Sequence, residues 1–109
     1  MEYIQSPSLL GYLIRLPDNY QAETSYPLLI GLHGGSGSAE SFISIWNDLH
    51  DREFMFVVPH APYPVFEDQD PRYDWAMWPR GNEDLIAIAT DLSVKYIVNV
   101  TKNICDLYD

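Results

Sequence analysis

One histidine, three glycines and two serines stand together in residues 32–38, which read LHGGSGS. A serine hydroxyl can act as a nucleophile, a glycine-rich loop can cradle a phosphate group, and backbone N–H groups can stabilise an oxyanion. These three kinds of chemistry make different demands on the surrounding residues. The neighbours of the segment therefore decide between them.

Ser36 is the candidate nucleophile of this segment. A nucleophile elbow is a sharp strand-to-helix turn that needs glycine two residues before and two residues after the serine. Gly34 meets the first requirement, but Ser38 stands where the second glycine is needed. The pattern therefore argues against Ser36 as a nucleophile.

A phosphate-binding loop is the second interpretation. A P-loop ends in Gly-Lys-Ser/Thr, and a dinucleotide loop needs its third glycine at a fixed offset. No lysine precedes Lys95, and Glu40 lies near the start of the predicted helix that would face the phosphate. Because a carboxylate at that place repels phosphate, the sequence disfavours this interpretation.

The third interpretation is an oxyanion hole, in which preorganised backbone N–H groups stabilise the charge of a tetrahedral acyl intermediate. Glycines suit such a loop because they let N–H groups turn inward and let a substrate approach without a Cβ atom in the way. The segment also opens a predicted helix, whose N-terminal dipole favours an anion. Of the three interpretations, this one fits the segment best.

Apolar runs on both sides of the loop predict the elements that position it. Residues 26–33 (YPLLIGLH) and 53–60 (EFMFVVPH) have the consecutive apolar residues of strands that are buried on both faces of a sheet. Residues 38–50 predict a helix with Ser38 as its N-cap. Its apolar face would comprise Phe42, Ile45, Trp46 and Leu49. This order predicts a βαβ unit with parallel strands and a right-handed crossover.

The remaining segments predict a strand, a long loop and a long helix. Residues 9–17 alternate loosely, as in a strand with one solvent-facing side, and residues 61–80 contain four prolines and little periodicity. Residues 82–109 show helical spacing, with Asn82 as the cap. The apolar positions of this helix are Leu85, Ala89, Leu92, Tyr96, Val100, Ile104 and Leu107.

Three stretches resemble the first half of an α/β-hydrolase, in particular the phospholipase/carboxylesterase group of serine esterases: YLIRLPDNY, YPLLIGLHGGSGSAESF and FVVPHAPYP. The resemblance covers residues 9–109. It implies an α/β fold, the N-terminal part of an α/β-hydrolase sheet with a parallel βαβ core and a long final helix. It also implies that Gly34, Gly35 and Ser36 form the oxyanion-hole loop, with Gly35 and Ser36 preferred as donors. His33 would shape the loop, and the catalytic base would come from elsewhere.

The chain departs from the family because it contains no Gly-x-Ser-x-Gly elbow and lacks the later acid and histidine. A complete domain of this kind runs to about 200–250 residues. We therefore expect residues 1–109 to be a single partial domain, truncated before the elbow. It would be the N-terminal fragment of a carboxylesterase, inactive alone, whose substrate when completed is a small-molecule ester. The alternative is a non-catalytic chain that pairs with itself or a partner through an exposed sheet edge and apolar helix face.

Other residues are weaker candidates for the site. His60 would end a strand and could border the substrate pocket, since ligands bind at the carboxyl ends of strands in open α/β sheets. Trp75 and Trp78 could line an acyl pocket or could cover the sheet edge, and the sequence leaves both open. The histidines lack zinc-site spacing, and the acidic residues 67–74 lack the order of a calcium loop. The sequence predicts neither a metal nor a cofactor.

Composition narrows the class of protein. The chain has 109 residues, 47% of them hydrophobic, which is typical of one small globular domain. A formal net charge of −10 disfavours binding to nucleic acid and to anionic membranes. The sequence shows no signal-peptide pattern and no apolar run near the ~18 residues of a membrane span, so we expect a cytoplasmic protein. Its one cysteine, Cys105, is expected to be a packed thiol.

Overall fold

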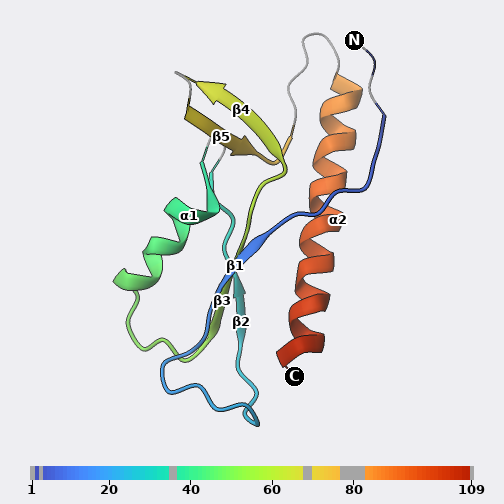
Figure 1. Cartoon of the computed structure of the whole chain (residues 1–109). Helices are drawn as coiled ribbons and strands as arrows, with labels where there is room; N and C mark the ends of the chain where they lie inside the picture. The colour runs from blue at the N-terminus through green and yellow to red at the C-terminus, as the bar shows by residue number, and fades with distance from the viewer. Residues whose placement is uncertain (1, 3, 35–36, 68–69, 77–82, 109) are drawn as a thin grey trace.

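The computed structural model describes the chain except for residues 1, 3, 35–36, 68–69, 77–82 and 109. It is a mixed α/β protein, with a small mixed sheet and a long C-terminal helix (Figure 1). The elements, in chain order, are β1 (Tyr12–Arg15), β2 (Leu28–Ile30), α1 (Ala39–Phe42), the 3₁₀ helix η1 (Ile43–Asp48), β3 (Met55–Pro59), β4 (Tyr63–Glu67), β5 (Asp70–Asp74) and α2 (Glu83–Tyr108).

The three-stranded sheet has the order β1-β3-β2, with β3 in the centre. β3 pairs parallel with β2, where Ile30 lies beside Val57, and antiparallel with β1, where Ile14 lies beside the same residue. α1 and η1 connect the two parallel strands, so the predicted βαβ unit is confirmed.

Two hydrophobic cores lie on the two faces of this sheet. Phe56 and Val58 of β3 pack with α1 and η1, while Met55 and Val57 pack against α2. Figure 1 shows the same arrangement, with α1 and α2 on opposite sides of the sheet. Every residue of β3 is buried, as predicted for a strand covered on both faces. The strand near the N-terminus is shorter than residues 9–17 and is partly covered on both sides, because Leu13 faces the first core and Ile14 the second.

β2 differs from the prediction of a strand that is buried on both faces. It lies at one end of the three-stranded sheet, and Leu29 keeps 47% of its surface exposed. Leu28 and Ile30 face the core beneath α2, so Leu29 faces the opposite side. α1 packs mainly against β1 and β3, so that side of β2 is only partly covered.

The helix predicted for residues 38–50 is divided into one α-helical turn and the 3₁₀ helix η1. Ser38 is the N-cap, as predicted, and its Oγ accepts a hydrogen bond from the backbone N–H of Ser41 at 3.2 Å. Because a 3₁₀ helix has three residues per turn, Ile43 and Trp46 share the buried side. Ile45, which was predicted to face the core, is exposed.

Residues 61–80 were predicted to be a loop, yet they contain the antiparallel pair β4 and β5. The register joins Tyr63 to Asp74 and Pro64 to Tyr73. Proline has no N–H group for a strand ladder, but the outer side of a two-stranded sheet needs none. The prolines therefore hid a hairpin that leads away from the main sheet and stands at one end of the molecule (Figure 1).

α2 forms where the helical spacing predicted it. Val100 and Ile104 are buried against the sheet, whereas Leu107 and Cys105 are exposed. The prediction that Cys105 is a packed thiol is wrong, because Cys105 is exposed. It follows the buried Ile104, and one step along a helix turns a side chain by about 100°. The predicted cap, Asn82, lies outside the described residues. Within the part of the chain that the structure describes, no helix is long and apolar enough to cross a membrane.

Candidate functional site

The candidate site lies at the carboxyl ends of the two parallel strands. Parallel pairing places the ends of β2 and β3 at one edge of the sheet, so the residues that follow them become neighbours. His33 and His60 come from these two ends, and their ring centroids are 6.0 Å apart. The sequence places these residues far apart, and the sheet brings them together.

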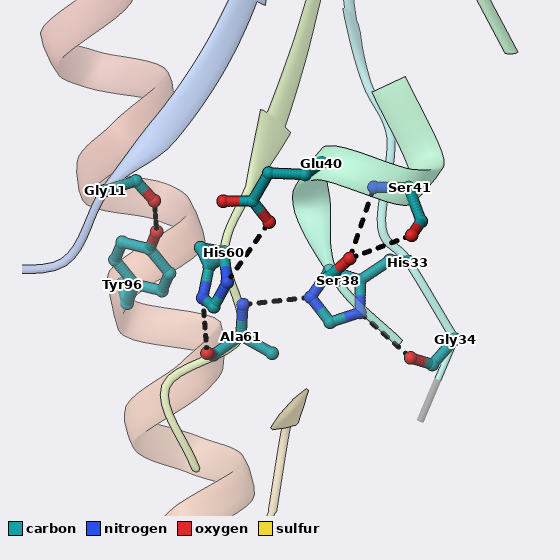
Figure 2. A network of polar contacts seen from close by, with 9 residues as sticks. All are labelled: Gly11, His33, Gly34, Ser38, Glu40, Ser41, His60, Ala61 and Tyr96. Carbon is teal, nitrogen blue, oxygen red and sulfur yellow. Dashed lines mark hydrogen bonds and ion pairs between the residues drawn. The ribbon is translucent and has the colours of Figure 1, made fainter. Parts of the chain in front are cut away.

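His33 is 3% exposed, and its two ring nitrogens are both hydrogen-bonded (Figure 2). The backbone N–H of Ala61 donates to Nε2 at 3.0 Å, so Nε2 must be the unprotonated acceptor. Nδ1 therefore carries the hydrogen and donates to the carbonyl of Gly34 at 2.9 Å. This arrangement selects the neutral imidazole and leaves neither nitrogen free to take a proton from a substrate or a serine.

The carbonyl of Gly34 accepts a second hydrogen bond, from the N–H of Gly37 at 3.1 Å. Glycine is required at position 37 because a Cβ atom there would lie 2.9 Å from that carbonyl oxygen and 3.3 Å from Nδ1 of His33. A Cβ atom at Gly34 would meet nothing within 4 Å. The loop is therefore closely packed at Gly37 and open at Gly34.

Two of the predicted oxyanion-hole residues, Gly35 and Ser36, lie outside the described residues. The predicted substrate-binding residue Trp78 does so as well. Gly34 is thus the predicted donor position that the structure describes.

Trp75 directly follows β5 and meets the loop from the open end of the β4–β5 hairpin, where Asp74 pairs with Tyr63. Its indole Nε1–H donates to the carbonyl of His33 at 2.9 Å, and its ring lies against the imidazole at a centroid distance of 5.1 Å. The hydroxyl of Ser93 in α2 donates to the carbonyl of Trp75 at 2.6 Å. Trp75, which was predicted to bind substrate, is thus hydrogen-bonded to the protein through both its indole ring and its backbone carbonyl.

The side chain of His60 is half-buried between the first turn of α1 and the β4–β5 hairpin. Its Nε2 lies 3.6 Å from a carboxylate oxygen of Glu40, and its Nδ1 lies 3.1 Å from the carbonyl of Ala61. The ring of Tyr73 meets the imidazole edge-on at a centroid distance of 4.2 Å, and the N–H of Tyr73 donates to the carbonyl of Gly37. The hairpin therefore contacts both histidines and the loop.

Tyr96 of α2 extends the network on the other side of His60. Its hydroxyl donates to the carbonyl of Gly11 at 2.7 Å (Figure 2). The same carbonyl accepts the backbone N–H of His60 at 3.0 Å. Burial raises the pKa of Tyr96 above its ordinary value of 10.0, because the phenolate would lose hydration there. Tyr96 is therefore a neutral donor that joins α2 to the edge of the sheet.

Sequence reasoning missed Tyr73 and Ser93 as neighbours of the loop. The signal for Tyr73 was the aromatic and β-branched composition of residues 63–67, which is typical of a strand and would have suggested a hairpin. Ser93 gave no signal, because a small polar residue on the buried face of a helix has many uses. Glu40 was considered only as an obstacle to phosphate, and it lies beside His60.

A groove of about 870 Å³ lies elsewhere, between the N-terminal segment and α2. Its apolar lining includes Leu9, Leu85, Ile88 and Leu92, and neither His33 nor Trp75 contributes to it. The described residues contain no group of three metal-ligating side chains. Among the described residues, this groove is therefore a separate feature from the loop and its two histidines.

No protein-family model matches the chain, and a search of curated proteins finds no match.

Proposed function

We propose that this chain supplies the oxyanion-hole part of a serine carboxylic ester hydrolase of the phospholipase/carboxylesterase group. The supporting observation is the pair of hydrogen bonds that His33 makes with Ala61 and Gly34. Because both of its ring nitrogens are bonded to backbone groups, His33 serves to hold the loop in shape. A glycine loop that is fixed in this way, after a parallel strand and before a helix, is suited to presenting N–H groups to a developing negative charge.

In this proposal a serine Oγ attacks the ester carbonyl carbon, and its proton passes to a base. The carbonyl oxygen becomes an oxyanion, which the loop N–H groups stabilise until it collapses to the acyl-enzyme and the base returns the proton to the departing alkoxide, which leaves as the alcohol. Water then repeats the attack on the acyl-enzyme and releases the acid. The nucleophile and the base come from a polypeptide segment that carries the Gly-x-Ser-x-Gly motif, which is absent from this sequence.

The first test uses the chain alone with 4-nitrophenyl acetate and a fluorophosphonate probe. We expect neither turnover nor labelling, since His33 is engaged and Ser36 lacks the elbow pattern. Turnover that disappears in Ser36→Ala would contradict the proposal and make Ser36 the nucleophile.

The second test supplies the missing groups. Residues 9–109 replace the corresponding part of a characterised esterase of the same group, and hydrolysis of 4-nitrophenyl acetate is measured. We expect activity in this chimera, and we expect Gly35→Pro, which removes one N–H donor, to lower kcat by about 10²–10³-fold. Ala22→Pro is the matched control, because Ala22 is exposed and follows Gln21 in the turn that the N–H of Thr24 closes on the carbonyl of Gln21, where proline is well tolerated. An equal loss in both variants would contradict an oxyanion role for the loop.

A second candidate function is self-association through the edge of β2. It is favoured by the exposed side chain of Leu29 on an edge strand, which is a surface that pairs readily with another strand. Sedimentation at several concentrations tests it, and Leu29→Lys should shift the chain toward monomer. A monomer at every concentration would exclude this function.

A further inference from the structure

We propose that Trp75 is a positioning residue, which orients the N–H group of Gly34 toward the oxyanion of the substrate. The inference rests on the proposed function and adds to it a residue from a different part of the fold. The sequence predicted that Trp75 would either contact substrate or cover the sheet edge. Its contacts in the structure favour a third role.

The argument begins with the peptide bond between His33 and Gly34. The indole Nε1–H of Trp75 donates to the carbonyl of this peptide at 2.9 Å. A peptide group is planar and trans, so its N–H points in the direction opposite to its C=O. Holding the carbonyl against Trp75 therefore directs the N–H of Gly34 away from Trp75. On Gly34 itself, a Cβ atom would meet nothing within 4 Å, so there is open space beside this residue.

The next peptide bond is fixed by a different side chain. Its carbonyl belongs to Gly34 and accepts from Nδ1 of His33 at 2.9 Å and from the N–H of Gly37 at 3.1 Å. Two successive carbonyls of the loop are thus bonded to protein donors, the first by Trp75 and the second by His33. Trp75 is the only one of these side-chain donors that comes from outside the loop.

Trp75 can impose an orientation only if it is itself held in place. The hydroxyl of Ser93 donates to its carbonyl at 2.6 Å, and its own N–H donates to Asp74 Oδ1 at 2.7 Å. Ser93 is 2% exposed on α2, so this residue is shielded from solvent. The packing of the indole against His33 restricts rotation of its ring. Trp75 therefore links Ser93 of α2 to the carbonyl of His33 in the loop.

The test is the direction of the Gly34 N–H bond in solution, measured as its residual dipolar coupling in the ¹⁵N-labelled chain. Trp75→Phe keeps an aromatic ring against His33 and removes the donor. We expect the coupling of Gly34 to move toward zero in this variant, while the couplings of Val57 and Val58 in β3 stay unchanged. Tyr73→Phe is the matched control, because Tyr73 bonds to the loop through its backbone N–H, and it should leave Gly34 unchanged.

An unchanged Gly34 coupling in a folded Trp75→Phe variant would overturn the proposal. If that variant does not fold, 3-benzothienylalanine at position 75 replaces the N–H with sulfur at nearly constant shape and gives the same readout. In the esterase chimera, Trp75→Phe should lower kcat by about 10- to 100-fold with KM unchanged, as expected for a misoriented donor. A changed Gly34 coupling in a chain whose chimera is inactive would support the orientation by Trp75 and refute the ester-hydrolase function.

Discussion

Replacing His33 by phenylalanine tests whether this residue is the structural centre of the loop. The ring is 3% exposed, and phenylalanine fills similar space without either nitrogen. The N–H of Ala61 then loses its acceptor in a place where Ala61 is 1% exposed, and an unsatisfied buried donor costs about 1–3 kcal/mol. The carbonyl of Gly34 loses one of two donors, which adds about 1 kcal/mol. We expect a total destabilisation of about 2–4 kcal/mol.

Urea unfolding followed by circular dichroism measures this free energy of unfolding. The matched control is His60→Phe, because that imidazole is half-buried and its partner Glu40 is exposed, so the loss should stay below about 1 kcal/mol. His33→Gln offers an amide oxygen to the N–H of Ala61 and should recover part of the loss. A His33→Phe variant as stable as His60→Phe would refute the argument that the two hydrogen bonds fix the loop.

Three further predictions concern single groups. Ser38→Ala removes the N-cap of α1 and should lower the free energy of unfolding by about 1 kcal/mol in the same urea experiment. Gly37→Ala forces a Cβ atom to 2.9 Å from the backbone oxygen of Gly34 and should cost about 1–3 kcal/mol, whereas Gly34→Ala, which meets nothing within 4 Å, should change stability by less than about 0.5 kcal/mol. Equal effects of the two alanines would contradict the crowding at Gly37. The pKa of Tyr96 is raised in the folded chain, so the neutral phenol stabilises the fold at any pH below the ordinary value of 10.0, and this contribution is lost as pH rises through the folded pKa. The free energy of unfolding of Tyr96→Phe should therefore fall less steeply than that of the parent chain as pH rises above 10. If the two free energies depend on pH in the same way, Tyr96 makes no such contribution.

The elements that the sequence predicted well are those whose own residues determine their environment. The run MFVVP in β3 is apolar at every position, and the structure covers both of its faces. The similar run in β2 predicted the same environment, but β2 lies at the sheet edge, where Leu29 is exposed. Burial on both faces depends on neighbouring elements, and an apolar run alone cannot specify them.

The site was predictable only in part for the same reason. The glycines and His33 indicate a loop of unusual backbone conformation, because these residue types are uncommon at the end of a strand. Trp75 lies 42 residues further along the chain, and nothing in the spacing of the two residues shows that the indole meets the carbonyl of His33. Contacts of this kind depend on the path of the hairpin, which the prolines at positions 64 and 71 concealed.

The carbonyl oxygen of Gly11 receives donors from two elements, the backbone N–H of His60 and the hydroxyl of Tyr96. Both bonds share one acceptor, so Gly11 joins α2 to the residue that follows β3. When α2 undocks locally, the hydroxyl of Tyr96 leaves this carbonyl, but the N–H of His60 keeps its bond to Gly11, so we expect the amide hydrogen of His60 to stay protected from exchange after the helix has opened.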